Sequence, residues 1–183
     1  FNLAKINFPG HTELLAKSEN NENYMMMFLS EKLKAGLLTI HLPISKISSR
    51  ISKKRIIKSI NLLNLTAMRD LGMSNPKIAV VGLNPHAGEN GLIGNEEEMI
   101  IKPAIKSLQK KINVTGPFVP DAFWGNKTYK KFDMILGMYH DQILIPFKLL
   151  NFNSGVNFTA GLDLIRTSPD HGTAYDIAGM NKA

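Results

Sequence analysis

A continuous apolar run at residues 78–83 constrains the fold of this chain more than any other feature. Its residues are apolar at successive positions rather than at alternate ones, which is typical of a parallel strand buried on both faces. The run stops at Asn84-Pro85, and His86 follows inside a glycine-rich loop. Asn95 and the glutamates after it are typical of a helix N-terminus. Ligands of open α/β sheets bind just beyond the carboxyl ends of the strands, so this loop is predicted to contribute to a site.

The same arrangement, an apolar strand followed by a histidine, occurs twice more. Residues 37–40 lead into His41, and residues 134–138 lead into Tyr139-His140-Asp141. Parallel strands bring their carboxyl ends to one edge of a sheet, so we expect His41, His86 and His140 to meet there. Three imidazoles with a carboxylate nearby suit Zn²⁺, Mn²⁺ or Co²⁺, with one position left for substrate or water. Asp141 would then orient a ligand, act as a general base or bind the metal itself. The alternative is three unrelated loop histidines.

Two helical patterns separate the predicted strands. The longer one spans about residues 48–71, with apolar residues at three- and four-residue spacing and Gly72 as a stop signal. A strand, this helix and the strand at 78–83 form a βαβ unit, whose crossover is expected to be right-handed. The second pattern spans residues 95–111, where Pro103 marks either a kink or a later helix start.

The remaining segments complete an α/β fold. Residues 24–29 contain three successive methionines and are interpreted as a buried strand or core segment, because methionine fills cores well. Residues 114–120 are predicted to be extended, and residues 156–160 and 164–167 to form a final antiparallel or mixed pair. The predicted architecture is an open, largely parallel or mixed sheet flanked by helices.

Composition limits the classes of function. The chain of 183 residues contains no cysteine, which excludes disulfides and thiolate metal ligands and leaves His, Asp and Glu for any metal. No apolar run approaches the roughly 18 residues of a membrane span, and no signal-peptide pattern opens the chain. We therefore expect a cytoplasmic protein that does not engage a membrane.

The net charge of +7 raises the question of a nucleic-acid partner. The basic residues are dispersed, and the densest group, at residues 53–55, alternates with apolar residues as a solvated helix face does. A phosphorylated or carboxylated substrate accounts for the charge equally well. We expect no nucleic-acid binding.

Several polar side chains are suited to bind an anionic group. His11 and Thr12 begin a predicted helix, where they either bind an anion or simply cap the helix. Lys148, Asn157 and Arg166 follow the third histidine closely enough to line the same crevice. The loop at residues 168–174 is rich in residues that often approach a cofactor, although this signal is weak alone.

Five motifs, in order along the chain, resemble those of the 4-hydroxythreonine-4-phosphate dehydrogenase family. They cover residues 9–13, 39–43, 83–89, 138–142 and 166–174, with the sequences PGHTE, TIHLP, LNPHAGE, MYHDQ and RTSPDHGTA. The loop at residues 171–179 is also similar to the adenosine-binding loop of isocitrate and isopropylmalate dehydrogenases, so the resemblance implies their fold. It further implies that residues 1–183 are the metal- and substrate-binding region of a two-domain dehydrogenase whose N-terminal part and C-terminal end are absent.

The resemblance implies a reaction and a role for each site residue. NAD, or NADP, would oxidise 4-phosphohydroxy-L-threonine, and loss of CO₂ would give 3-amino-2-oxopropyl phosphate for pyridoxal 5′-phosphate biosynthesis. The implied metal (Zn²⁺, Mg²⁺ or Co²⁺) is bound by His41, His86 and His140, and the substrate by His11, Thr12, Lys148, Asn157 and Arg166. The implied nucleotide loop contains His171, Gly172, Thr173, Ala174 and Asp176. The family is a homodimer with metal ligands from both subunits, and we propose Asp141 and Asp121 as candidate catalytic groups.

Two alternatives stay open. A related dehydrogenase could use the same metal and phosphate machinery on another phosphorylated hydroxy acid. A non-catalytic metal- and phosphate-binding module would bind metal without producing NADH.

Overall fold

A computed structural model describes residues 11–18, 23–151, 154–169 and 178–181 of the chain. Within these residues, seven strands form one mixed sheet in the order β4-β3-β5-β2-β1-β6-β7. The pairs β3–β4, β3–β5 and β2–β5 are parallel, whereas β1–β2, β1–β6 and β6–β7 are antiparallel. The strands are β1 (Met25–Leu29), β2 (Lys34–Leu37), β3 (Ile78–Val81), β4 (Val114–Phe118), β5 (Met134–Gly137), β6 (Val156–Ala160) and β7 (Thr167–Pro169).

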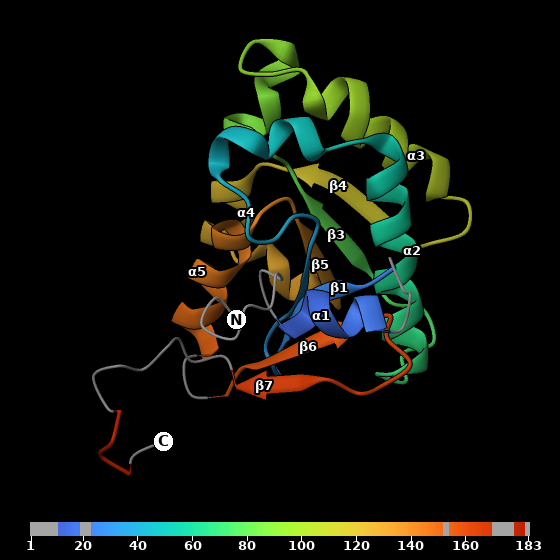
Figure 1. Cartoon of the computed structure of the whole chain (residues 1–183). Coiled ribbons are helices and arrows are strands. Elements are labelled where there is room, and N and C mark those ends of the chain that lie inside the picture. Colours follow the sequence, from blue (N-terminus) through green and yellow to red (C-terminus); the bar gives the residue numbers. More distant parts are fainter. Residues whose placement is uncertain (1–10, 19–22, 152–153, 170–177, 182–183) are drawn as a thin grey trace.

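Helices cover both faces of the sheet, which is therefore the middle of three layers (Figure 1). α2 and α3 pack on one face, and α4 and α5 on the other. The helices are α1 (His11–Ser18), α2 (Lys53–Arg69), α3 (Lys102–Leu108), α4 (Pro120–Gly125) and α5 (His140–Asn151). Short 3₁₀ turns are η1 (Ile44–Lys46), η2 (Ser48–Arg50), η3 (Pro85–Gly91) and η5 (Thr128–Lys131), and η4 (Glu97–Ile101) is a π-helical turn.

Strand β3 is buried on both faces, as its continuous apolar sequence predicts. Ile78 and Val80 pack against α2 and α3, while Ala79 and Val81 pack against α4 and α5. None of the four side chains is exposed. Burying one Val or Ile side chain stabilises the fold by about 1.5–3 kcal/mol, so this short strand contributes to the core on both faces of the sheet.

The methionine-rich segment is strand β1, and the prediction that it belongs to the core is confirmed. Met25 and Met27 face the α2 layer, whereas Met26 and Phe28 face the α5 layer. The antiparallel pair β6–β7 is also as expected, although β7 begins at Thr167, three residues later than the predicted start.

The two long helical patterns start later than the sequence indicates. α2 begins at Lys53 because Ser52 caps it, accepting a hydrogen bond from the Arg55 backbone N–H at 3.2 Å, and the residues before the cap form η1 and η2. The second pattern is divided into η4 and α3. Pro103 is the second residue of α3 and directly follows the π-helical turn, so the change of helix type coincides with the proline.

Strand β2 is displaced toward the N-terminus relative to the predicted strand at 37–40. It pairs with β1 from Lys34 onward, and its last hydrogen bond to β5 runs from the Leu38 N–H to the Gly137 carbonyl at 2.9 Å. Residues 38–40 therefore extend beyond the sheet before His41. None of the described helices combines the length and the apolar composition that crossing a membrane requires.

Candidate active site at the carboxyl edge of the sheet

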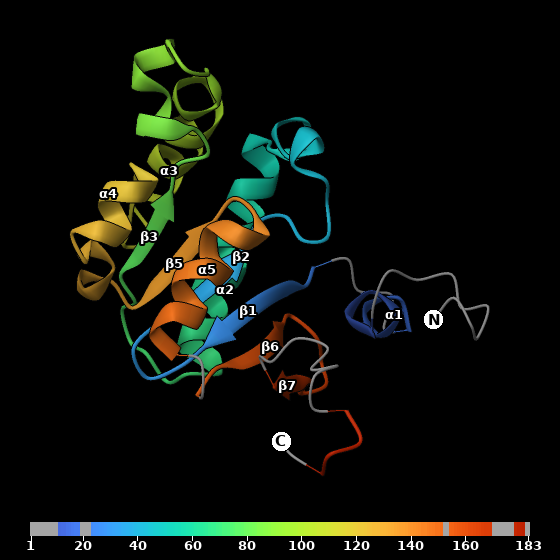
Figure 2. The ribbon, with the colours of Figure 1, turned by 90° about the vertical axis from the view of Figure 1, so that its left-hand side faces the viewer.

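The three strands that precede the histidines are neighbours in the sheet. β3, β5 and β2 lie side by side and run parallel, so the predicted common edge is confirmed. The loops that follow β2 (cyan) and β3 (green) both project from this end of the molecule (Figure 2). This is the edge at which α/β proteins bind ligands.

His41 and His140 come close together at this edge. Their ring centroids lie 6.4 Å apart with the ring planes at 40°. Both rings line a cavity of about 250 Å³, together with Thr39, Tyr139 and Asp141 among others. Thr39 donates a hydrogen bond from Oγ1 to the Met138 carbonyl at 2.6 Å, which joins the two histidine-bearing segments beneath the cavity.

The orientation of His140 is set by its neighbour in the sequence. Its Nδ1 lies 2.6 Å from Asp141 Oδ1. A carboxylate only accepts hydrogen bonds, so Nδ1 carries the proton and donates, which in a neutral imidazole leaves the lone pair on Nε2. An imidazole held in this way is prepared to bind a metal through Nε2. This contact supports Asp141 as an orienting residue.

His86 occupies an unusual backbone segment. From His86 to Asn90, five successive residues have positive φ, between 44° and 80°, although only Gly88 among them is a glycine. Such left-handed conformations are costly for other residues and cluster at functional sites. The side chain of His86 is exposed.

His86 does not join the other two histidines within one chain. Among the described residues, no three His, Asp or Glu side chains gather closely enough to hold one metal ion. The expectation that parallel strand ends alone would bring all three rings together is therefore not met. The chain enters the left-handed turn of η3 at His86 itself, which has a φ of 53°, and so does not continue in the strand direction there.

Asn157 and Arg166 share one face of the β6–β7 hairpin. Asn157 and Thr159 lie two residues apart on β6 and so point to the same side. Arg166 Nη1 lies 3.5 Å from Thr159 Oγ1, which brings its guanidinium to that side. Among the described residues, nothing donates a hydrogen bond to the buried Oδ1 of Asn157. A buried acceptor without a donor is costly, which suits a ligand that donates one.

The other predicted site residues do not line the His41–His140 cavity or lie outside the described residues. Lys148 is half-buried on α5. Asp121 is exposed in the first turn of α4, a helix that contacts η3 rather than the His41–His140 cavity. His11 and Thr12 begin α1, but their side chains are not described, and neither is the predicted nucleotide loop: His171, Gly172, Thr173, Ala174 and Asp176.

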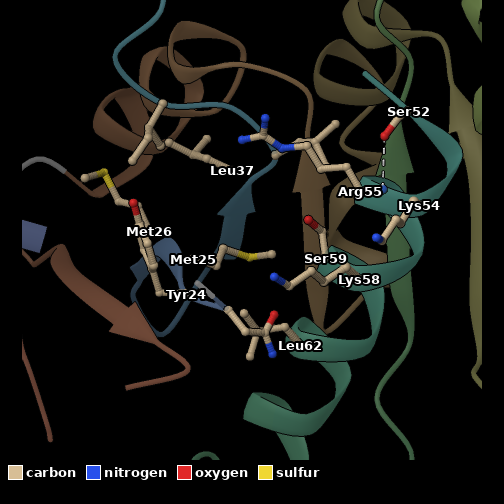
Figure 3. Close-up of a pocket in the computed structure, with 13 residues that line it drawn as sticks. Tyr24, Met25, Met26, Leu37, Ser52, Lys54, Arg55, Lys58, Ser59 and Leu62 are labelled. Carbon is tan, nitrogen blue, oxygen red and sulfur yellow. Dashed lines mark hydrogen bonds between the residues drawn. The ribbon is translucent and has the colours of Figure 1, made fainter. Parts of the chain in front are cut away.

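A second cavity, of about 370 Å³, lies between the first turns of α2 and the adjoining ends of β1 and β2 (Figure 3). It shares Ile40 with the histidine cavity, and Lys54, Arg55 and Lys58 contribute to its wall. The pKa of Arg55 is lowered, first by burial and then by the nearby charge of Arg50. Lys53 and Lys54 are exposed, as predicted for a solvated helix face, whereas Arg55 is partly buried.

Comparison with known proteins identifies the family. The model of the pyridoxal phosphate biosynthetic protein PdxA matches residues 1–183. The chain belongs to the PdxA family.

The similarity to individual relatives is consistent with membership of the PdxA family. It is 50% identical over 177 residues to the 4-hydroxythreonine-4-phosphate dehydrogenase of Sulfurihydrogenibium sp. (strain YO3AOP1), an alignment that covers 96% of this chain and 54% of the relative. It is 46% identical to the D-threonate 4-phosphate dehydrogenase of Pectobacterium atrosepticum, with the same coverage.

A solved structure also matches the PdxA-family chain. The 4-hydroxythreonine-4-phosphate dehydrogenase of Klebsiella pneumoniae superposes with a TM-score of 0.83 at 46% identity, over 96% of this chain and 53% of that one. The chain thus spans about half the length of the curated relatives it matches, as the 54% coverage states.

Proposed function

We propose that the full-length protein is a dehydrogenase that oxidises 4-phosphohydroxy-L-threonine with NAD⁺ and releases CO₂. The observation that carries this proposal is the approach of His41 and His140, with His140 held by Asp141, at the ligand edge of a PdxA-family chain. The names of the relatives support the oxidation of a phosphorylated hydroxy acid. The use of NADP in place of NAD is the corresponding cofactor alternative.

The donor set fits a divalent cation such as Zn²⁺, Mg²⁺ or Co²⁺. His41 and His140 offer imidazole nitrogens from one subunit, and His86 of the partner subunit would complete the set in a homodimer. A bound cation would polarise the substrate hydroxyl and stabilise the negative charge left when CO₂ departs. The charge-assisted contact of Asp141 with Nδ1 of His140 supports metal binding through Nε2.

The other residues bind and orient the substrate. Arg166 and Asn157 would bind phosphate and polar groups from the β6–β7 hairpin, with Lys148 from α5 and with His11 and Thr12 at the start of α1. Bound NAD⁺ would supply the hydride acceptor for the carbon that bears the hydroxyl. The hydroxyl proton would pass to a base, for which Asp141 is the first candidate and Asp121 the second. The bond to the carboxyl carbon would then break, CO₂ would leave, and the carbon that carried the carboxyl group would take up a proton to give the product.

The remaining parts of this proposal concern the setting of the enzyme. The loop with His171, Gly172, Thr173, Ala174 and Asp176 would contact the nucleotide. A cytoplasmic location, a role in pyridoxal phosphate biosynthesis and the lack of a nucleic-acid partner are further parts of it.

NADH formation tests the proposal. The full-length protein is incubated with NAD⁺ and 4-phosphohydroxy-L-threonine, with and without Zn²⁺, Mg²⁺ or Co²⁺, beside a His86→Ala variant. We expect metal-dependent NADH from the wild-type protein and none from the variant. A folded dimer that binds metal but makes no NADH from any phosphorylated hydroxy acid would refute the proposal in favour of a non-catalytic module.

D-threonate 4-phosphate is the second candidate substrate. The relative named D-threonate 4-phosphate dehydrogenase is 46% identical to this chain, and the relative named 4-hydroxythreonine-4-phosphate dehydrogenase is 50% identical. The two identities are close. A higher kcat/KM for D-threonate 4-phosphate in the same assay would select this alternative.

A further inference from the structure

The loop that carries His86 is built around a buried carboxylate. Glu97 in η4 is completely inaccessible to solvent. Its Oε1 accepts hydrogen bonds from the backbone N–H groups of Leu83 and Asn84, both at 2.7 Å, and its Oε2 accepts one from Asn84 Nδ2 at 2.9 Å. A carboxylate offers only acceptors, so these three donors match it. Glu97 therefore fixes the two residues at which the chain leaves β3.

Two glycines make room for this carboxylate on either side of His86. A side chain at Gly82 would place its Cβ 3.2 Å from Glu97 Oε1, and one at Gly88 would lie 2.8 Å from Glu97 Oε2. Gly88 also has φ of +80°, a conformation that other residues adopt only with strain. The glycine-rich loop is thus shaped by its contact with Glu97.

The neighbouring glutamate ties the same loop to the segment that follows His41. Asn84 Nδ2 donates a second hydrogen bond, to Glu96 Oε2 at 2.8 Å. Glu96 Oε1 accepts a hydrogen bond from Ser48 Oγ in η2. The pKa of Glu96 is lowered by these two donors, Ser48 first and Asn84 second.

A second set of side-chain bonds ties β3 to the segment that bears His140. Gln142 Nε2 donates to the Gly82 carbonyl at 2.6 Å, and Gln142 Oε1 accepts from the Met138 backbone N–H at 2.7 Å. The Met138 carbonyl accepts the hydrogen bond of Thr39, two residues before His41. Every histidine-bearing segment is thereby bonded to the next.

The side chains that link these segments by hydrogen bonds are together named the polar brace: Thr39, Asn84, Glu96, Glu97 and Gln142. Three of its members, Thr39, Glu97 and Gln142, are at most 8% exposed. Buried polar networks are rigid when every member is satisfied, because a lost partner leaves a costly unpaired group. We propose that the polar brace positions the segments of His41, His86 and His140, with Glu97 as the positioning residue for His86.

This inference rests on the proposed function in taking the histidines as metal ligands. Each subunit would present its own His41 and His140 to one site and its His86 to the other, so the brace fixes two half-sites on one sheet edge. Replacing a group that hydrogen-bonds directly to a metal ligand typically changes metal affinity by about 10–100-fold, and Glu97 acts on the His86 segment through Leu83 and Asn84. The predicted effect of losing Glu97 is of that size.

Glu97→Gln in the full-length protein tests the inference. The glutamine keeps the shape and can still accept from the Leu83 and Asn84 N–H groups, but its NH₂ group faces Asn84 Nδ2, so two donors oppose each other. Glu98→Gln is the matched control, because it removes the same charge one residue away. Glu98 pairs with Lys102 and is not part of the brace.

Two readouts are measured for wild type and both variants: the Kd for Zn²⁺ by calorimetry, and amide hydrogen exchange at Leu83 and Asn84 in metal-free protein. We expect Glu97→Gln to raise the Kd about 10–100-fold and to speed exchange at both amides, with kcat recovered at saturating metal. Glu98→Gln should match the wild type in both readouts.

A folded Glu97→Gln protein with wild-type Zn²⁺ affinity would overturn the inference. If that variant does not fold, Asn84→Ala serves instead, since it removes the amide that joins both glutamates but keeps the backbone bonds. Unchanged Zn²⁺ affinity in Asn84→Ala would then overturn it. Failure of the wild-type protein itself to bind any metal would refute the proposed function, which separates the two results.

Discussion

Replacing Gln142 by methionine tests the polar brace through stability. Methionine has a similar size and shape but cannot make the bonds that Gln142 makes to the Gly82 carbonyl and the Met138 N–H. Both backbone groups belong to buried residues. Leaving one buried polar group unpaired costs about 1–3 kcal/mol, so two such groups predict a loss of about 2–6 kcal/mol in the free energy of unfolding. That is a large share of the about 5–15 kcal/mol that stabilises a typical protein.

The assay is urea unfolding of the full-length protein at one fixed subunit concentration. Gln109→Met is the matched control, because Gln109 is exposed and donates a single long bond, 3.4 Å, to the Val114 carbonyl. The control should stay within about 0.5 kcal/mol of the wild type. Equal stability of the Gln142→Met and Gln109→Met proteins would refute the reasoning.

Three further changes have defined outcomes. Gly88→Ala should destabilise the His86 loop, since its Cβ would lie 2.7 Å from the Gly94 carbonyl oxygen at a positive φ, and faster amide exchange at Ile93 will report this. Glu96→Gln should lower the free energy of unfolding at neutral pH but not in acid. Hydrogen bonds lower the pKa of Glu96 below its usual 4.5 in the folded protein. The stability that the Glu96 carboxylate contributes is therefore full above pH 4.5 and is lost as the pH falls through the folded-state pKa. Asp141→Asn should reduce kcat by about 10-fold or more, because the hydrogen bond to His140 loses its charge.

For each of these three predictions, one result would contradict the reasoning. Unchanged exchange at Ile93 in Gly88→Ala would show that the loop tolerates a side chain. A stability difference between wild type and Glu96→Gln that persists at low pH would assign the effect to packing. Wild-type turnover in Asp141→Asn would remove that residue from the mechanism.

The α/β fold class could be predicted from the periodicity of apolar residues, whereas the candidate site could be predicted only in part. The runs before His41, His86 and His140 are apolar because their strands are covered on both faces, and that pattern is local in the sequence. The alternation of these strands with helices predicts an α/β fold with parallel strands, whose carboxyl ends share one edge of the sheet. The order of strands at the two edges depends on long-range pairing, which no local pattern encodes.

Glu97 shows what a local pattern misses. The sequence Asn95-Glu96-Glu97-Glu98 predicts a helix cap with acidic residues in the first turn, and a π-helical turn does begin at Glu97. The role of Glu97 depends on donors 13 and 14 residues earlier, so only the tertiary structure reveals that this glutamate is buried. The positive φ values after Pro85 are equally hard to predict from the sequence, because most of these residues, such as His86 and Ala87, are not glycines.

The measurement that tests the central claim most directly is complementation between two inactive variants. His86→Ala and His140→Ala proteins of full length are mixed, unfolded and refolded together, and metal-dependent NADH formation is compared with that of the wild type. If each site takes His41 and His140 from one subunit and His86 from its partner, every mixed dimer regains one intact site, and random pairing restores about a quarter of wild-type activity. No recovery in confirmed mixed dimers would contradict a metal site shared between subunits.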